Sequence, residues 1–192
     1  MSTGSIFKFL VYASIVVWLF PPIRQFRQRN FYFFLILALM DPIALVYFKI
    51  FNSTISFNYY LIGNYLLLIS VLWNSNKSEI KYSLAVGGIF YLILLFTINF
   101  SAKDHLFIAI ILQFILLIVF LKTFIVEYAI NSKLNFFYLA LVFYILTIIS
   151  KFLIVLIGFA DATAFFIITT IAQILFGLFF SIYRENKPGT AL

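Results

Sequence analysis

The sequence predicts an all-α fold: a polytopic integral membrane protein, built as a bundle of seven transmembrane helices with its N-terminus outside and its C-terminus in the cytoplasm. Of its 192 residues, 65% are hydrophobic and only 10% are charged. A soluble domain of this length cannot bury so much apolar surface, so lipid must form part of its solvent. Short polar segments divide the chain into seven apolar stretches, and the basic residues gather in alternate segments.

The first two spans are predicted at residues 5–20 and 31–51. The first is apolar apart from Lys8, and Pro21 with Pro22 is expected to end it. A secretory signal has its charges before the apolar core and a small-residue cleavage site after it, whereas here the basic run follows. We therefore expect an uncleaved first helix. The rival interpretation has six spans, with this stretch lying in the interface.

The remaining spans are predicted at residues 57–73, 82–100, 105–130, 136–160 and 164–183. The fifth reaches roughly 39 Å at 1.5 Å per residue, so its end should protrude beyond the hydrocarbon. Residues 1–183 then form a single transmembrane domain, and residues 184–192 form a short, polar cytoplasmic tail.

The orientation follows from the distribution of lysine and arginine, which marks the cytoplasmic side. With seven spans, one side carries Arg24, Arg27, Arg29, Lys77, Lys81, Lys133, Arg184 and Lys187, and the other carries Lys8, Lys49 and Lys103. This imbalance predicts the N-terminus outside. The abundance of Phe, Ile, Asn and Lys is typical of an AT-rich genome and favours a bacterial inner membrane.

A polar layer is predicted inside the bundle. Asp41 lies near the centre of the second span, where an ionised side chain costs at least about 2.5–3.5 kcal/mol and normally faces the bundle interior. Counting inward at 1.5 Å per residue places one strongly polar side chain from each of five spans about 10–15 Å deep. These candidates for an intramembrane polar site are Asp41, Asn64, Gln113, Lys151 and Gln173.

Asp41 and Lys151 are the only opposite charges predicted deep in the membrane, and we expect them to pair because attraction would offset desolvation. Pro42 cannot donate to the Ala38 carbonyl, which leaves an acceptor beside the acid for a cation or a proton-carrying group. The alternatives are that Lys151 extends toward the surface, and that the amides only bond helix to helix.

Most catalytic chemistry is disfavoured. The chain has no cysteine, which excludes disulfides and thiol chemistry. One histidine and six dispersed acids argue against zinc, and nucleotide-binding and hydrolase motifs are missing from the sequence. We expect no catalytic residue, cofactor or metal, and no enzyme activity, with an intramembrane lipid-modifying enzyme using Asp41 as the exception.

The predicted topology resembles that of two families of seven-helix proteins, but the chain lacks the sequence motifs of both. Rhodopsins need a lysine in the last helix, where this chain has none, and sugar transporters of the three-plus-one-plus-three type carry matched prolines in both halves. Here the four prolines are Pro21, Pro22, Pro42 and Pro188, and Pro188 lies in the tail, so the prolines of the first half have no counterpart in the spans of the second.

The leading functional hypothesis is a non-enzymatic sensor or partner subunit of a membrane complex. Its cytoplasmic basic surface of Arg24, Arg27 and Arg29 would face anionic lipid or a partner protein. Its basic residues are too scattered for nucleic acid. The alternative is a small-molecule or ion transporter that couples through Asp41, with the amides contacting the ligand.

Overall fold

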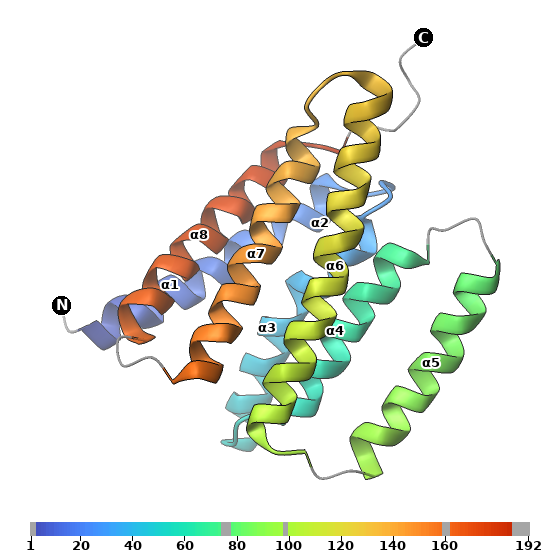
Figure 1. Ribbon diagram of the computed structural model, residues 1–192. Helices are drawn as coiled ribbons and strands as arrows, with labels where there is room; N and C mark the ends of the chain where they lie inside the picture. The colour runs from blue at the N-terminus through green and yellow to red at the C-terminus, as the bar shows by residue number, and fades with distance from the viewer. Residues whose placement is uncertain (1–2, 74–77, 98–99, 159–161, 186–192) are drawn as a thin grey trace.

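The computed structural model describes residues 3–73, 78–97, 100–158 and 162–185, and within these every regular element is a helix (Figure 1). The all-helical prediction is therefore confirmed for this part of the chain. The helices are α1 (Thr3–Trp18), α2 (Phe20–Arg24), α3 (Phe31–Phe51), α4 (Phe57–Leu72), α5 (Ser78–Thr97), α6 (Ala102–Asn131), α7 (Phe136–Ile157) and α8 (Ala162–Ile182).

Four helices are long and apolar enough to cross a membrane: α3, α6, α7, and residues Thr163–Ile182 of α8. Helices α1 and α4 have 16 residues each. A helix of that length spans about 24 Å, which is less than the ~30 Å of a typical hydrocarbon core. The structure is thus that of an apolar helical bundle with several candidate spans, and the seven crossings remain a prediction.

The expectation that two prolines end the first helix is wrong. Helix α1 ends at Trp18, and Pro21 with Pro22 stands in the first turn of the short helix α2. In a first turn the backbone N–H groups have no intrahelical acceptor, so the missing proline N–H costs no hydrogen bond. The Gln25 N–H then donates to the Pro21 carbonyl over 2.8 Å at the end of α2.

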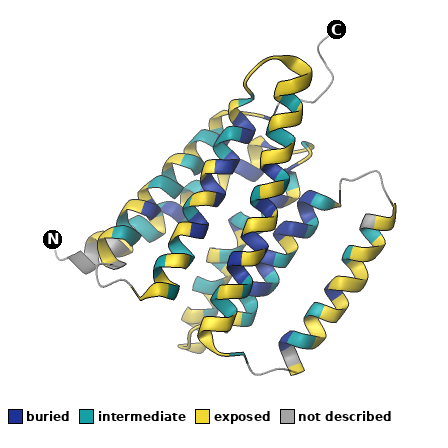
Figure 2. Ribbon diagram, in the orientation of Figure 1, coloured by how far each residue is buried: buried dark blue, intermediate teal, exposed yellow. Residues whose placement is uncertain are grey.

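Six of the long helices form a closed ring in the order α1, α3, α4, α6, α7 and α8, with α8 packing back on α1 (Figure 1). The described part of α5 contacts only α4 and lies outside the ring. Burial follows this arrangement: buried residues face the centre of the ring, whereas α5 is largely exposed (Figure 2). Large aromatic side chains fill one part of the core, among them Phe33, Phe34, Phe120, Phe137 and Phe180.

The C-terminal end of α8 is fastened to the segment between α2 and α3. Gln25 is fully buried and donates from Nε2 to the carbonyls of Phe180 and Tyr183, at 3.1 and 2.7 Å. Its Oε1 accepts from the Glu185 N–H at 3.0 Å. A residue of the predicted polar tail is therefore part of the fold, and the tail beyond it lies outside the described residues.

The Glu185 carboxylate completes this attachment. It is buried and accepts from the Asn30 N–H at 3.2 Å, from Asn30 Nδ2 at 3.1 Å and from the Tyr138 hydroxyl at 2.5 Å. We call Gln25, Asn30, Tyr138 and Glu185 the C-terminal clasp. Burial raises the pKa of Glu185 above its ordinary value, although these donors and the nearby Arg29 guanidinium act in the opposite direction.

Candidate functional site

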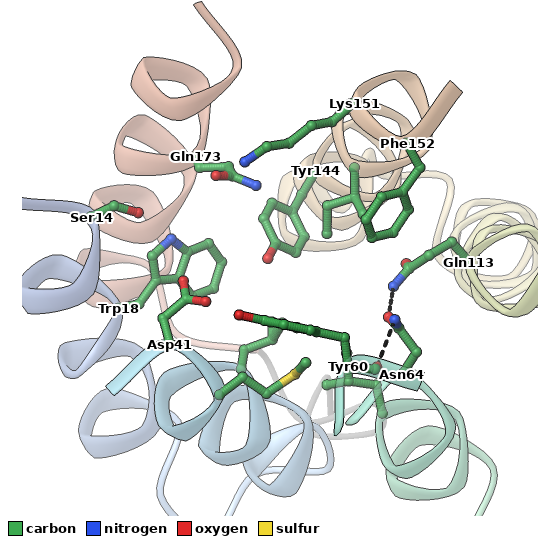
Figure 3. A pocket seen from close by; sticks show the side chains of 14 residues that line it. Ser14, Trp18, Asp41, Tyr60, Asn64, Gln113, Tyr144, Lys151, Phe152 and Gln173 are labelled. Carbon is green, nitrogen blue, oxygen red and sulfur yellow. Dashed lines mark hydrogen bonds between the residues drawn. The ribbon is translucent and has the colours of Figure 1, made fainter. Parts of the chain in front are cut away.

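A cavity of about 200 Å³ lies inside the ring, and all six ring helices contribute to its wall (Figure 3). The five polar residues that the sequence predicts at similar depth all line it. The full lining is Ser14, Trp18, Leu37, Met40, Asp41, Tyr60, Asn64, Leu67, Gln113, Tyr144, Ile148, Lys151, Phe152 and Gln173. Polar side chains that are distant in sequence therefore line one common cavity.

Helical periodicity explains how Asp41 and Gln113 reach the cavity. On α3, Asp41 lies three residues after the buried Ala38, which itself lies four residues after the buried Phe34. On α6, Gln113 lies between the buried residues Ala109 and Leu116 with the same spacing. Residues at these intervals share one face of a helix, so the polar side chains continue an otherwise apolar inward stripe.

The side-chain amides of Asn64 and Gln113 form a hydrogen-bonded pair, which we call the relay, and their hydrogen-bond partners fix the orientation of each amide. The Tyr60 carbonyl can only accept, so Asn64 must present Nδ2 to it, at 2.9 Å. Asn64 Oδ1 consequently faces Gln113 and accepts from Nε2 at 2.5 Å. Gln113 Oε1 is left buried without a hydrogen-bond partner. Figure 3 shows this oxygen turned away from Asn64.

The Asp41 carboxylate opens into the cavity and has no hydrogen-bond or ion-pair partner among the described residues. Figure 3 shows it beside Trp18, with the Tyr60 hydroxyl pointing toward it. Pro42 follows it inside α3, and the Tyr59 hydroxyl donates to the Met40 carbonyl at 2.9 Å just before it. An ionisable group and a gap in the hydrogen bonding of the helix, left by the missing proline N–H, thus coincide at the cavity wall.

Lys151 stands on another side of the cavity and points toward Gln173 in Figure 3. Its Nζ lies 5.3 Å from the centroid of the Phe166 ring on α8, within the range of a cation–π contact. Within the described ranges the structure holds no ion pair between Lys151 and Asp41. The predicted direct contact is not made, because Lys151 extends toward α8 and the carboxylate lies on α3, but the two charges still act on each other across the cavity.

Aromatic side chains that the sequence analysis did not assign to the site surround Asp41. The rings of Trp18 and Tyr144 lie 4.8 Å apart between centroids, tilted by 39°. The hydroxyls of Tyr60 and Tyr144 have no hydrogen-bond partner in the described part of the chain, and both point into the cavity (Figure 3). Tyr60 is four residues before Asn64 and therefore shares its helix face, which is a signal that could have placed it.

The predicted basic surface is only partly brought together. Arg24 and Arg27 line an open hollow with Arg184 and three apolar side chains, Phe20, Ile23 and Phe26. Arg24 Nε donates to the Ile182 carbonyl at 3.1 Å, and Arg184 donates to the Phe26 carbonyl at 3.4 Å. Arg29 lies instead near the C-terminal clasp, where its charge acts on Glu185.

The described residues contain no group of three or more histidine and acidic side chains placed to hold a metal ion. Comparisons of the chain with known protein families, with curated proteins and with solved structures find no match. Function must therefore be inferred from the cavity.

Proposed function

We propose that this chain is a transporter of a small polar molecule that binds in the central cavity, with Asp41 as its coupling site. The observation that carries the proposal is the buried, unpartnered Gln113 Oε1 at the wall of a cavity that also holds an unpaired carboxylate. A buried acceptor without a donor costs about 1–3 kcal/mol. A ligand that donates to this oxygen removes that cost.

A second hollow beside the cavity favours transport over binding alone. It has a volume of about 210 Å³ and extends to His105 at the start of α6. Three side chains, Tyr60, Asn64 and Phe152, line both hollows and therefore separate them. Alternating access requires a binding site that can be opened and closed. Here movement of a few side chains would open a route between the cavity and the second hollow.

Asp41 is suited to coupling because its charge can change. An ionisable group deep in a membrane protein is expensive to keep charged and is found along ion and proton pathways. Binding of a cationic group, or of a proton, offsets the cost of the carboxylate. The proposal therefore includes exchange of a proton with the substrate at Asp41.

The proposed setting is a bacterial inner membrane crossed seven times, with the N-terminus outside and without enzyme activity. Two observations support this topology. Consecutive long helices run in alternate directions (Figure 1), and the C-terminal clasp holds the end of α8 at the same end of the bundle as Gln25, just after α2. An odd number of crossings is consistent with both.

Uptake into proteoliposomes tests the proposal. Vesicles containing the purified protein are mixed with ¹³C-labelled small metabolites from a cell extract, under an inside-alkaline pH gradient, and retained solutes are identified by mass spectrometry. We expect at least one polar solute to be retained by the native protein and lost with Asp41→Asn. Glu79→Gln, an exposed acid on α5, is the matched control and should retain it.

Equal retention by the native protein, by Asp41→Asn and by empty vesicles would overturn the transport proposal. If vesicles with the Asp41→Asn variant retain the same solute as vesicles with the native protein, Asp41 is not the coupling site, and the transport proposal stands without it.

A second candidate function, a sensor or partner subunit, is favoured by the open hollow of Arg24, Arg27 and Arg184. Its combination of arginine and exposed apolar side chains is typical of surfaces that bind partners. Purification from native membranes in mild detergent, followed by mass spectrometry, tests it. A stoichiometric partner lost with Arg24→Ala and Arg27→Ala together would support this function.

A further inference from the structure

We propose that the ligand of the central cavity is a small zwitterion of the amino-acid type, with its ammonium group at Asp41 and its carboxylate at Lys151 and Gln173. This inference rests on the proposed function and names its substrate class.

Charge compensation is the first step. The cavity wall contains one acid, Asp41, and one base, Lys151, and they do not form an ion pair with each other among the described residues. The two charges act on each other only across the cavity, without direct contact, and charges that lack hydrogen-bonded partners in a low-dielectric interior are unfavourable. A simple cation bound at Asp41 would add a net positive charge beside Lys151, and a simple anion bound at Lys151 would add a net negative charge beside Asp41. A zwitterion compensates both charges and keeps the net charge of the site unchanged.

The surroundings of Asp41 fit an ammonium group. The aromatic rings of Trp18, Tyr60 and Tyr144 line the cavity on this side (Figure 3). Aromatic faces attract organic cations, by about 2 kcal/mol or more when the cation is desolvated. An ammonium group supplies three N–H donors. The Asp41 carboxylate and the Tyr60 hydroxyl that points toward it can both accept from such a group on this side of the cavity.

The surroundings of Lys151 fit a carboxylate. Lys151 offers an ammonium and Gln173 an amide, and Figure 3 shows both on the side of the cavity away from the Asp41 carboxylate. Lys151 Nζ lies 5.3 Å from the centroid of the Phe166 ring, and this contact leaves its N–H donors available to an anion. The two ends of the ligand are therefore recognised by different helices.

The volume limits the ligand to a small molecule. The cavity measures about 200 Å³, whereas an apolar cavity of about 150 Å³ accommodates benzene, with six non-hydrogen atoms. A ligand of about eight non-hydrogen atoms fits on this scale. Alanine and valine lie within this limit, and leucine, with one atom more than valine, tests it.

Matched probes separate the two charges. Alanine, valine and leucine are each compared with the amine that lacks the carboxylate and with the acid that lacks the amine; for leucine these are 3-methylbutylamine and 4-methylpentanoate. Binding to the purified native protein is measured by calorimetry. We expect at least one amino acid to bind at least ten-fold more tightly than both of its partial analogues.

A change of selectivity in variants tests the placement of each end. Lys151→Gln removes the positive charge, so the amine is expected to bind as tightly as the amino acid or more tightly. Asp41→Asn removes the negative charge, so the acid is expected to gain relative to the amino acid. A residue with a purely structural role would weaken all three probes together. Lys122→Gln, at an exposed position on α6, is the control that leaves the ranking unchanged.

The proposal is overturned if none of the three amino acids binds the native protein at least ten-fold more tightly than both of its partial analogues. The native protein suffices for this result, so a variant that fails to fold does not prevent it. Asp41-dependent uptake of a solute that is not zwitterionic would leave the transport proposal intact and remove only this substrate class.

Discussion

At the scale of single residues, the relay of Asn64 and Gln113 joins α4 to α6 and also sets what the cavity offers to a ligand. Asn64→Leu leaves Gln113 Nε2 without its acceptor, and Gln113→Leu leaves Asn64 Oδ1 without its donor. Each change is expected to lower stability. The double variant should lose less than the sum of the single losses, with a coupling energy of about 0.6–2 kcal/mol.

A double-mutant cycle measured by reversible unfolding in mixed micelles checks this expectation. Additive losses would show that the 2.5 Å contact between the two amides contributes nothing to stability. The same variants in a binding assay would separate support of the fold from contact with the ligand.

Glu185 leads to a prediction about pH. Burial raises its pKa in the folded protein above the ordinary 4.5, so the folded state holds the proton more tightly than the unfolded state does. The contribution of Glu185 to stability is therefore greatest below about pH 4.5 and is lost as the pH rises through its folded pKa. We expect the melting temperature to decrease over this range, and the decrease to be smaller in Glu185→Gln, which cannot ionise.

The melting temperature is followed by tryptophan fluorescence between pH 4.5 and 7. Glu79→Gln, at an exposed position on α5, should keep the native slope. An unchanged slope in Glu185→Gln would assign the pH dependence to another group.

The sequence predicts some residues of the site better than others. Depth along each span placed Asp41, Asn64, Gln113, Lys151 and Gln173 in one layer, and the structure puts all of them at one cavity. Depth fixes only one coordinate, however. The direction of Lys151 and the inward position of Trp18 depend on how α1, α7 and α8 are rotated. Glu185 was missed because a polar stretch at a chain end looks the same whether it is solvated or held by buried partners.

At the scale of elements, the contact of α1 with α8 depends on Gly177. A Cβ at this position would lie 2.8 Å from Val17 Cγ1 and 3.3 Å from Trp18 Nε1. Val17 is branched at Cβ and has little rotamer freedom in a helix. Gly177→Ala is therefore expected to cost about 1–3 kcal/mol and to weaken ligand binding through displacement of Trp18.

Gly63 provides the matched comparison. A Cβ there would meet the far end of the Met40 side chain, and methionine is unbranched and adapts easily. Gly63→Ala is expected to cost less than Gly177→Ala in the same unfolding measurement. The reverse order would show that the contact of α1 with α8 is looser than described.

The helix ends were predictable to the extent that a strong local signal marks them. Asn52 stands in the left-handed conformation after α3, with φ of 50°, and the predicted bounds of that span were correct. The end of α1 was not, because proline stops a helix when it is interior and starts one when it is in the first turn, and the sequence alone does not distinguish these.

At the scale of the whole molecule, the proposed topology can be tested directly because the native chain has no cysteine. Single cysteines at Ser53, after α3, and at Lys133, after α6, are exposed positions. With the N-terminus outside, we expect a membrane-impermeant maleimide to label Ser53→Cys in intact cells, and to label Lys133→Cys only after the membrane is opened.

Labelling of both positions in intact cells would contradict the proposed crossings. Labelling of Lys133→Cys alone in intact cells would show that the N-terminus lies in the cytoplasm, which is the reverse of the proposed orientation. A cysteine at Ile23, which is exposed beside Arg24, should behave as Lys133→Cys does.

The ring itself lay beyond prediction from the sequence. Helices that face lipid on one side and protein on the other are apolar all round, so hydrophobic periodicity says little about which of them are neighbours. The exclusion of α5 from the ring, and the packing of α1 against α8, are properties of the assembled bundle.

The closure of the ring has a consequence for how the protein is made. Helix α3 emerges from the ribosome and enters the membrane with Asp41 before the segments that carry Gln113, Lys151 and Gln173 have been synthesised. Its carboxylate must therefore be inserted without most of the side chains that later surround it. The cavity is complete only when α8, the last helix described, has packed against α1.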